Sequence, residues 1–235
     1  MTDILQSRAP PPQPKNRLSR REPAAKQILE MLRERIVKGD LAPGARIVER
    51  TVCAEMNVSR TPLREALKLL AIDGLVQISQ HKGATVMPFT PEEALQLFEV
   101  LSGLEGLAAE LAVSRIANAT LADLRAKHDQ MRTHFDRGEK DAYFELNSAI
   151  HTAIVEAAGN PILASTHHAL LLRAKRGRYM AIVDPHRWRE AFDEHEAVMD
   201  AFAKKDAKRA GEVWRTHLIH TGETVADVLR AAMPD

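Results

Sequence analysis

Apolar residues recur at helical spacing along most of the chain, and the first clear stripe begins after Pro23. Its positions lie three to four residues apart, which is the spacing of one face of an α-helix. They are Ile28, Leu32, Ile36 and Val37. The stretch KGDLAPGARI then ends this helix in a Gly/Pro turn. A second short helix fits residues 48–56, with Val52 and Met56 on its apolar face.

The residues that follow predict a tight turn, a third helix and a hairpin. Asn57 tolerates left-handed backbone and can turn the chain before Ser59 caps the next helix, where Pro62 is acceptable in the first turn. After Gly74 come two β-prone runs, LVQI and ATVM, joined by SQHKG, whose glycine suits a hairpin turn. This order of elements predicts a winged helix-turn-helix over residues 23–88.

In such a module the second helix of the pair enters the major groove of DNA with its N-terminal residues leading. Arg60 and Arg64 lie at that end, four residues apart and therefore on one face. A guanidinium can bind phosphate or the O6/N7 edge of guanine, where each bidentate contact gives about 1–3 kcal/mol of discrimination. Ser59 and Thr61 could add hydroxyl contacts to phosphate. The alternative is that Arg64 pairs with Glu65 or another carboxylate on a solvated face.

The charge distribution supports a polyanionic partner for this module. The formal net charge is +1, yet residues 1–88 hold 15 Lys and Arg against 9 Asp and Glu, or +6. Residues 89–235 hold 18 Lys and Arg against 23 Asp and Glu, or −5, and they also hold nine of the ten histidines. A basic module therefore precedes an acidic one. Unevenly distributed solvated charge is the alternative.

The chain after residue 89 predicts an all-helical module. The segment FTPEEALQLFEV opens with Thr90 as N-cap, Pro91 at the first helical position and Glu93 three residues after the cap. No alternating strand pattern follows, and breaks fall at NATLAD, DRGEKD, GNP, VDPHR and KKDAK. Because the connections are short, six antiparallel helices are expected.

Four polar residues of this module occupy positions where apolar side chains are expected. At about 100° per residue, each lies on the apolar face of its helix. They are Asn147, His151, His195 and His217. A buried imidazole needs partners for both nitrogens, and a metal ion held by neutral imidazoles is the simplest explanation for several that converge.

Spacing along the chain brings two of these histidines to one level. His195 lies ten residues before Lys205, and His217 lies eleven residues after Asp206. A helical hairpin that turns at KKDAK therefore places both imidazoles roughly 15 Å from the turn, at about 1.5 Å per residue. Asn147 and His151, four residues apart on a third helix, would supply two further ligands.

A hydrogen-bonded core residue is the alternative for each histidine, because a lone imidazole on an apolar face is more often structural than a metal ligand. His128 illustrates this alternative, since it also lies between Leu124 and Met131 on an apolar stripe. His220 falls at the edge of its stripe and is a weaker ligand candidate.

Composition narrows the class of protein. Residues 1–22 are rich in proline and arginine without an apolar core, so they predict a disordered basic arm rather than a secretory signal. No apolar run is long enough to cross a bilayer, which predicts a cytoplasmic protein without a membrane partner. Cys53 is the one cysteine, which allows neither an internal disulfide nor a thiolate metal site.

The stretch LAPGARIVERTVCAEMNVSRTPLREALKLLAIDGLVQISQHKGATV resembles the DNA-binding domain of the GntR family of bacterial transcription regulators. The shared features are a P-G turn, an E-R pair, the run VSRTPLREAL, the DGLV stop and a glycine in the wing. The resemblance implies DNA contacts by Arg50, Ser59, Arg60, Thr61, Pro62, Arg64 and Gly83. Residues 81–83, the wing tip, would lie at or in the minor groove. Thr51 departs from the usual acidic residue.

The helical module resembles the FadR C-terminal (FCD) domain, whose metal-binding members have D/N-x-x-x-H, then E-H, then H about 22 residues later. The resemblance assigns metal binding to Asn147, His151, His195 and His217, with zinc preferred and nickel or manganese as alternatives. It also implies a small carboxylate effector beside the metal. An arginine often stands four residues before the first-helix glutamate, but here Leu101 precedes Glu105. Arg173 and Arg178 are therefore the candidates for an anion clamp, and the alternative is that they are solvated or face the other subunit of a dimer.

These observations predict a mainly α protein in three parts: a disordered arm at 1–22, a winged helix-turn-helix at 23–88 and an antiparallel helical bundle at 89–235. The predicted function is a homodimeric, metabolite-responsive repressor that binds a palindromic operator. One alternative is a metal sensor in which the ion is the signal. Another is a metal-dependent hydrolase with Glu194 or Glu196 as general base, although an enzyme leaves the first module unexplained.

Overall fold

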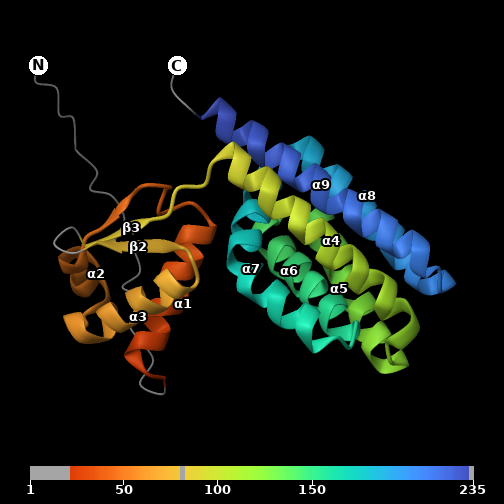
Figure 1. Cartoon of the computed structure of the whole chain (residues 1–235), viewed down its shortest axis with the longest axis horizontal. Helices are drawn as coiled ribbons and strands as arrows, with labels where there is room; N and C mark the ends of the chain where they lie inside the picture. The colour runs from red at the N-terminus through yellow and green to blue at the C-terminus, as the bar shows by residue number, and fades with distance from the viewer. Residues whose placement is uncertain (1–21, 80–82, 233–235) are drawn as a thin grey trace, which may run out of the picture.

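The computed structural model describes residues 22–79 and 83–232, which form two parts with separate apolar cores (Figure 1). The mainly α architecture, a winged helix-turn-helix followed by a helical bundle, is confirmed. The predicted disordered arm lies outside the described residues except for Glu22, as do residues 81 and 82 of the wing tip. Among the described residues, no helix combines the length and apolar composition needed to cross a membrane.

The first part contains three helices and a small sheet. The helices are α1 (Ala24–Val37), α2 (Glu49–Met56) and α3 (Arg60–Ile72). The strands are β1 (Arg46–Ile47), β2 (Val76–Ser79) and β3 (Gly83–Val86), antiparallel in the order β1-β3-β2. The expected apolar stripe of α1 is buried in the core of this part, together with the leucine face of α3.

The turn between α2 and α3 follows the prediction in its backbone. Asn57 adopts the left-handed conformation with φ of 54°, and Ser59 occupies the N-cap position of α3. The Ser59 side chain makes no capping hydrogen bond, however. At the start of the bundle, Thr90 and Glu93 form the predicted capping box, with reciprocal hydrogen bonds of 3.1 Å and 3.2 Å.

β1 was not expected, because two residues are too few to show an alternating pattern. It pairs with β3, with Arg46 opposite Thr85 and Ile47 opposite Ala84. This pairing ties the segment that leads into α2 to the wing. The start of α2 is therefore held beside the sheet.

The second part contains six helices within the described residues, as predicted. They are α4 (Pro91–Arg115), α5 (Asn118–Asp136), α6 (Lys140–Ala157), α7 (Pro161–Ala181), α8 (Pro185–Lys204) and α9 (Ala207–Ala231). α4 and α9 lie side by side along most of their length (Figure 1). Glycines permit this approach: a Cβ on Gly222 would lie 2.6 Å from the Cβ of Phe98.

α7 contacts both parts of the molecule (Figure 1). Leu172 packs against the core of the first part. Arg176 donates to the carbonyl oxygen of Met87 at 3.1 Å, and its guanidinium lies 5.3 Å from the centre of the Phe89 ring. The connection between the parts is therefore held directly by a helix of the bundle.

Candidate functional site

The N-terminal end of α3 faces solvent. The expected DNA contacts at this end are exposed (Ser59, Arg60, Thr61, Arg64) or half-buried (Pro62). Arg50 is exposed on α2, and Gly83 begins β3 with φ of 78°. A helix that buries its leucine face and exposes cations at its leading end has the arrangement that enters a major groove.

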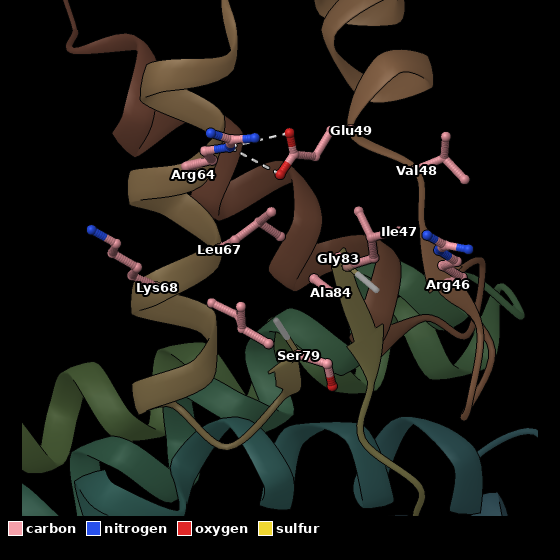
Figure 2. Close-up of a pocket in the computed structure, with 11 residues that line it drawn as sticks. Arg46, Ile47, Val48, Glu49, Arg64, Leu67, Lys68, Ser79, Gly83 and Ala84 are labelled. Carbon is pink, nitrogen blue, oxygen red and sulfur yellow. Dashed lines mark hydrogen bonds and ion pairs between the residues drawn. The ribbon is translucent and has the colours of Figure 1, made fainter. Parts of the chain in front are cut away.

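An open groove of about 700 Å³ runs between α3 and the wing (Figure 2). Arg46, Arg64 and Lys68 give it three cationic side chains, and Gly83 lies in its wall. Arg64 also contacts Glu49, the first residue of α2, through its Nε. The alternative expectation for Arg64, an ion pair with a carboxylate, is thus seen, although the partner is not Glu65.

Three histidines from three helices meet inside the bundle: His151 from α6, His195 from α8 and His217 from α9. One ring nitrogen of each lies within 4.8 Å of one from each of the others. The Nε2 atoms of His151 and His217 are 3.3 Å apart. All three residues are at most 2% exposed. The structure thus brings together three of the four residues assigned to metal binding from the sequence.

Carboxylates fix two of these imidazole rings. Nδ1 of His151 lies 2.5 Å from Oε2 of Glu105, on α4. Nδ1 of His217 lies 2.6 Å from Oε2 of Glu194, on α8. A carboxylate on the outer nitrogen of a metal-binding histidine sets the ring orientation and raises its basicity as a ligand.

Both carboxyls are ionised. Burial raises the pKa of Glu105, but Arg178 and His151 outweigh it and hold the pKa well below its usual value. Burial likewise raises the pKa of Glu194, but the contacts with His217 and Arg187 bring it down to about 2. Ionised carboxylates only accept hydrogen bonds, so the Nδ1 atom of each facing imidazole carries the proton.

The inward nitrogens consequently lack protons. Burial lowers the pKa of all three imidazoles, to about 3 for His151. A neutral imidazole has one proton, so the Nε2 atoms of His151 and His217 present lone pairs to each other. Tetrahedral zinc ligands at about 2.0–2.1 Å from the ion are themselves about 3.3 Å apart. Both nitrogens of His195 are buried without a hydrogen-bond partner. The donor set fits a divalent metal ion.

A small cavity adjoins the histidines. Its lining includes Asn147, Arg178, Arg187, His217 and Thr221. The volume of about 10 Å³ corresponds to about one water molecule. Asn147, the fourth expected ligand, is therefore buried beside the cluster.

Two buried arginines of this cavity have unused donors. Nε and Nη1 of Arg178 and Nε of Arg187 have no hydrogen-bond partner in the described part of the chain. The remaining nitrogen of Arg178 pairs with Glu105. Arg187 donates to the carbonyl oxygen of His217 and to Oγ1 of Thr221, each at 2.9 Å. A buried N–H group without an acceptor can donate to an anionic oxygen, so these donors could each bind one oxygen of a carboxylate.

Arg173 lies elsewhere, which corrects the expectation that it flanks the effector site. It is half-exposed at 4.0 Å from Glu93, beside Gly74 of the first part. The reason is helical phase, because five residues separate Arg173 from Arg178 and place the two about 140° apart around α7.

Two contributing residues, Glu105 and Arg187, were given no role in the site from the sequence. Glu105 accepts from His151 and also contacts His167, at 2.9 Å, and Arg178. A charged residue on the apolar stripe of α4 was the signal for Glu105. Arg187 gave no signal, since PHRWRE at a helix start resembles a solvated segment.

His128, the example of a structural histidine, and His220, the weaker ligand candidate, both lie outside the cluster. His128 is buried with its ring centre 6.5 Å from that of His195. His220 is partly exposed and lies 2.7 Å from Glu194. Neither proposed general base is free, because Glu194 contacts His217 and Arg187, while Glu196 pairs with Arg132 at 2.5 Å.

Comparison with known proteins agrees with both parts. Residues 24–86 match the bacterial regulatory proteins of the gntR family, and residues 96–220 match the FCD domain. The HTH-type transcriptional repressor RspR of Escherichia coli is 28% identical over 207 residues, which cover 88% of this chain and 91% of RspR. An HTH-type transcriptional regulator in an unstable DNA locus of Streptomyces ambofaciens is 31% identical, with 82% and 81% covered.

The structure of E. coli McbR/YncC has a TM-score of 0.75 to this chain at 21% identity, covering 89% of this chain and 99% of McbR. This likeness supports the fold alone. The FCD match spans more than half of the chain, and the gntR match spans the winged helix-turn-helix. The chain therefore belongs to the GntR family of bacterial transcription regulators, with an FCD domain, and is a regulator rather than an enzyme.

Proposed function

We propose that this regulator is a cytoplasmic repressor that binds a palindromic operator as a homodimer and is released by a small organic acid. RspR, which resembles it over most of both chains, carries the description repressor. The exposed cations of α3 supply the DNA-binding face. Two symmetric copies of such a face suit two half-sites related by a two-fold axis.

The FCD domain holds one divalent metal ion in this proposal, through His151, His195, His217 and Asn147. The observation that carries it is the pair of facing Nε2 atoms, 3.3 Å apart, whose protons are drawn to the opposite sides of the rings. Without a cation, two lone pairs would be buried against each other. Zinc and nickel suit imidazole ligands, and manganese, which prefers oxygen ligands, is the third candidate.

The effector is a carboxylate that reaches the metal and the unused donors of Arg178 and Arg187. Buried donors without acceptors cost about 1–3 kcal/mol each, and a carboxylate would satisfy them. The cavity has space for about one water molecule, so a larger ligand must move its walls. This displacement would be the structural signal.

The small cavity also favours a second candidate, a sensor for which the metal ion alone is the signal. An ion fits between the histidines without enlarging the cavity. Titrating DNA binding with zinc, in the presence and absence of carboxylates, separates the two candidates. Zinc alone changes the DNA affinity of a metal sensor, whereas a carboxylate is also needed if the organic acid is the signal.

Elemental analysis of protein purified from medium with zinc, nickel and manganese tests the metal site. We expect about one ion per chain in the wild type, and a loss of most of it in His195→Ala. Removing the ion should lower the melting temperature, because the metal binds the folded state.

His128→Ala is the matched control, because it also removes a buried imidazole that stacks near His195. It should keep its metal. A metal-free wild type that gains no thermal stability from any of the three ions would contradict the proposal, as would equal metal loss in both variants.

A further inference from the structure

Arg64 is held by a carboxylate of the neighbouring helix. Its Nε lies 3.1 Å and 3.2 Å from the two carboxylate oxygens of Glu49, as the dashed lines in Figure 2 show. The Arg64 side chain is 60% exposed, whereas that of Glu49 is 23% exposed. An arginine directed to solvent is therefore anchored by a partner that is itself largely covered.

The contact leaves the outer end of the guanidinium free. Neither Nη atom of Arg64 has a hydrogen-bond partner within the described residues. Recognition of guanine needs two parallel N–H groups directed at O6 and N7. With Nε occupied by Glu49, the two Nη groups are the pair that remains for this contact.

Glu49 is well placed to act as an anchor. It is the first residue of α2, where the helix N-terminus favours a negative charge. The residues immediately before it are fixed to the wing, because Ile47 pairs with Ala84 across β1 and β3. The carboxylate therefore has a fixed position relative to both α3 and the sheet.

We propose that Glu49 is a positioning residue that sets the base preference of Arg64 by presenting its two Nη groups to a guanine in each half-site. A preorganised arginine loses less rotamer freedom on binding than a free one. The negative charge of Glu49 also repels the phosphate backbone of the DNA, so it weakens binding to every sequence. Glu49 thus favours the correct base at the expense of non-specific affinity.

This inference rests on the proposed DNA-binding role of Arg64. The experiment therefore tests the role of Arg64 and the positioning role of Glu49 separately. Full-length wild type, Glu49→Gln, Arg64→Ala and the double variant are each used to select from duplexes with a randomised central 24 base pairs, followed by sequencing. Glu55→Gln is the matched control, because Glu55 pairs with Arg35 at 2.9 Å in the same module. Glu49→Ala repeats the test without a new amide.

We expect Arg64→Ala to lose one guanine from each half-site of the selected motif. Both Glu49 variants should lose discrimination at that same base by about tenfold, within the range of one bidentate contact. Their binding to a scrambled duplex should be retained or stronger. The double variant should discriminate at this base no less than Arg64→Ala does. Glu55→Gln should select the wild-type motif.

A wild-type motif from Arg64→Ala would overturn the DNA-binding role of Arg64 itself. If Arg64→Ala loses the guanine while the Glu49 variants keep it, or lose preference evenly at all positions, the positioning role of Glu49 is wrong. Melting temperatures of all variants exclude unfolding as the cause.

Discussion

At the scale of single residues, the buried charges around the histidine cluster balance before any ligand binds. Arg178 pairs with Glu105, and Arg187 pairs with Glu194 at 2.9 Å, while the second partner of Arg187, Glu190 at 3.2 Å, is partly exposed to solvent that screens its charge. The three imidazoles are neutral, and Asn147 is an amide where a carboxylate would also serve as a ligand. A bound divalent ion would therefore leave two uncompensated positive charges in a buried site, which a dianion would neutralise.

The first prediction is that dicarboxylates bind the metal-loaded protein more tightly than monocarboxylates of the same length. Asn147→Asp adds one negative charge to the site. It should lower the ratio of dicarboxylate affinity to monocarboxylate affinity by about tenfold, or about 1.4 kcal/mol. Calorimetry with succinate against butyrate, and glutarate against pentanoate, measures it. A preference that is unchanged in Asn147→Asp at equal metal content would contradict the charge argument.

The placement of a side chain in the site was predictable where it belongs to a periodic apolar pattern. The three histidines lie on apolar stripes, and the hairpin between α8 and α9 brings two of them to one level, as the spacing indicated. Arg187 and Glu49 were not predictable, because their roles depend on which neighbouring helix each helix start faces. Arg173 and Arg178 both flank the apolar face of α7, and only the packing of that helix decides that Arg178 reaches the cavity.

At the scale of elements, the close approach of α4 and α9 depends on small residues. A Cβ on Gly222 would lie 2.6 Å from the Cβ of Phe98, an atom that cannot move without its backbone. Gly103, on the exposed side of α4, has no atom within 4 Å of the position of an added Cβ. The two glycines therefore differ in what a methyl group would do.

The second prediction is that Gly222→Ala lowers the free energy of unfolding by about 1–3 kcal/mol, as overpacking does. Gly103→Ala should instead raise it by up to about 1 kcal/mol, because alanine is the better helix former. Urea denaturation of both variants measures the difference. Equal effects of the same sign would contradict the close packing of α4 and α9.

Elements were predictable from local signals more completely than contacts between them. The six bundle helices follow from caps, prolines and short breaks that act within a few residues. β1 consists of two residues and forms only because β3 lies beside it. The packing of α7 against both parts likewise has no local signal, since it depends on the whole fold.

At the scale of the whole molecule, α7 connects the small cavity beside the histidines to the DNA-binding part. Arg178 lines the cavity, and Arg176, two residues earlier, holds the carbonyl of Met87 in the connection. A ligand that enlarges the cavity would move this helix and with it the link to the first part. A ligand shifts such an equilibrium only by its differential affinity for the two states, and tenfold weaker DNA binding requires about 1.4 kcal/mol of coupling.

The most direct measurement of this mechanism is DNA affinity as a function of carboxylate concentration, in zinc-loaded wild type and in His151→Ala. The probe is the palindrome that the wild type selects from randomised duplexes, and the ligands are the carboxylates that raise its melting temperature. We predict that these acids weaken wild-type binding at least tenfold and leave the binding of His151→Ala unchanged. Equal release of DNA from the wild type and from metal-free His151→Ala would contradict a metal-dependent effector site.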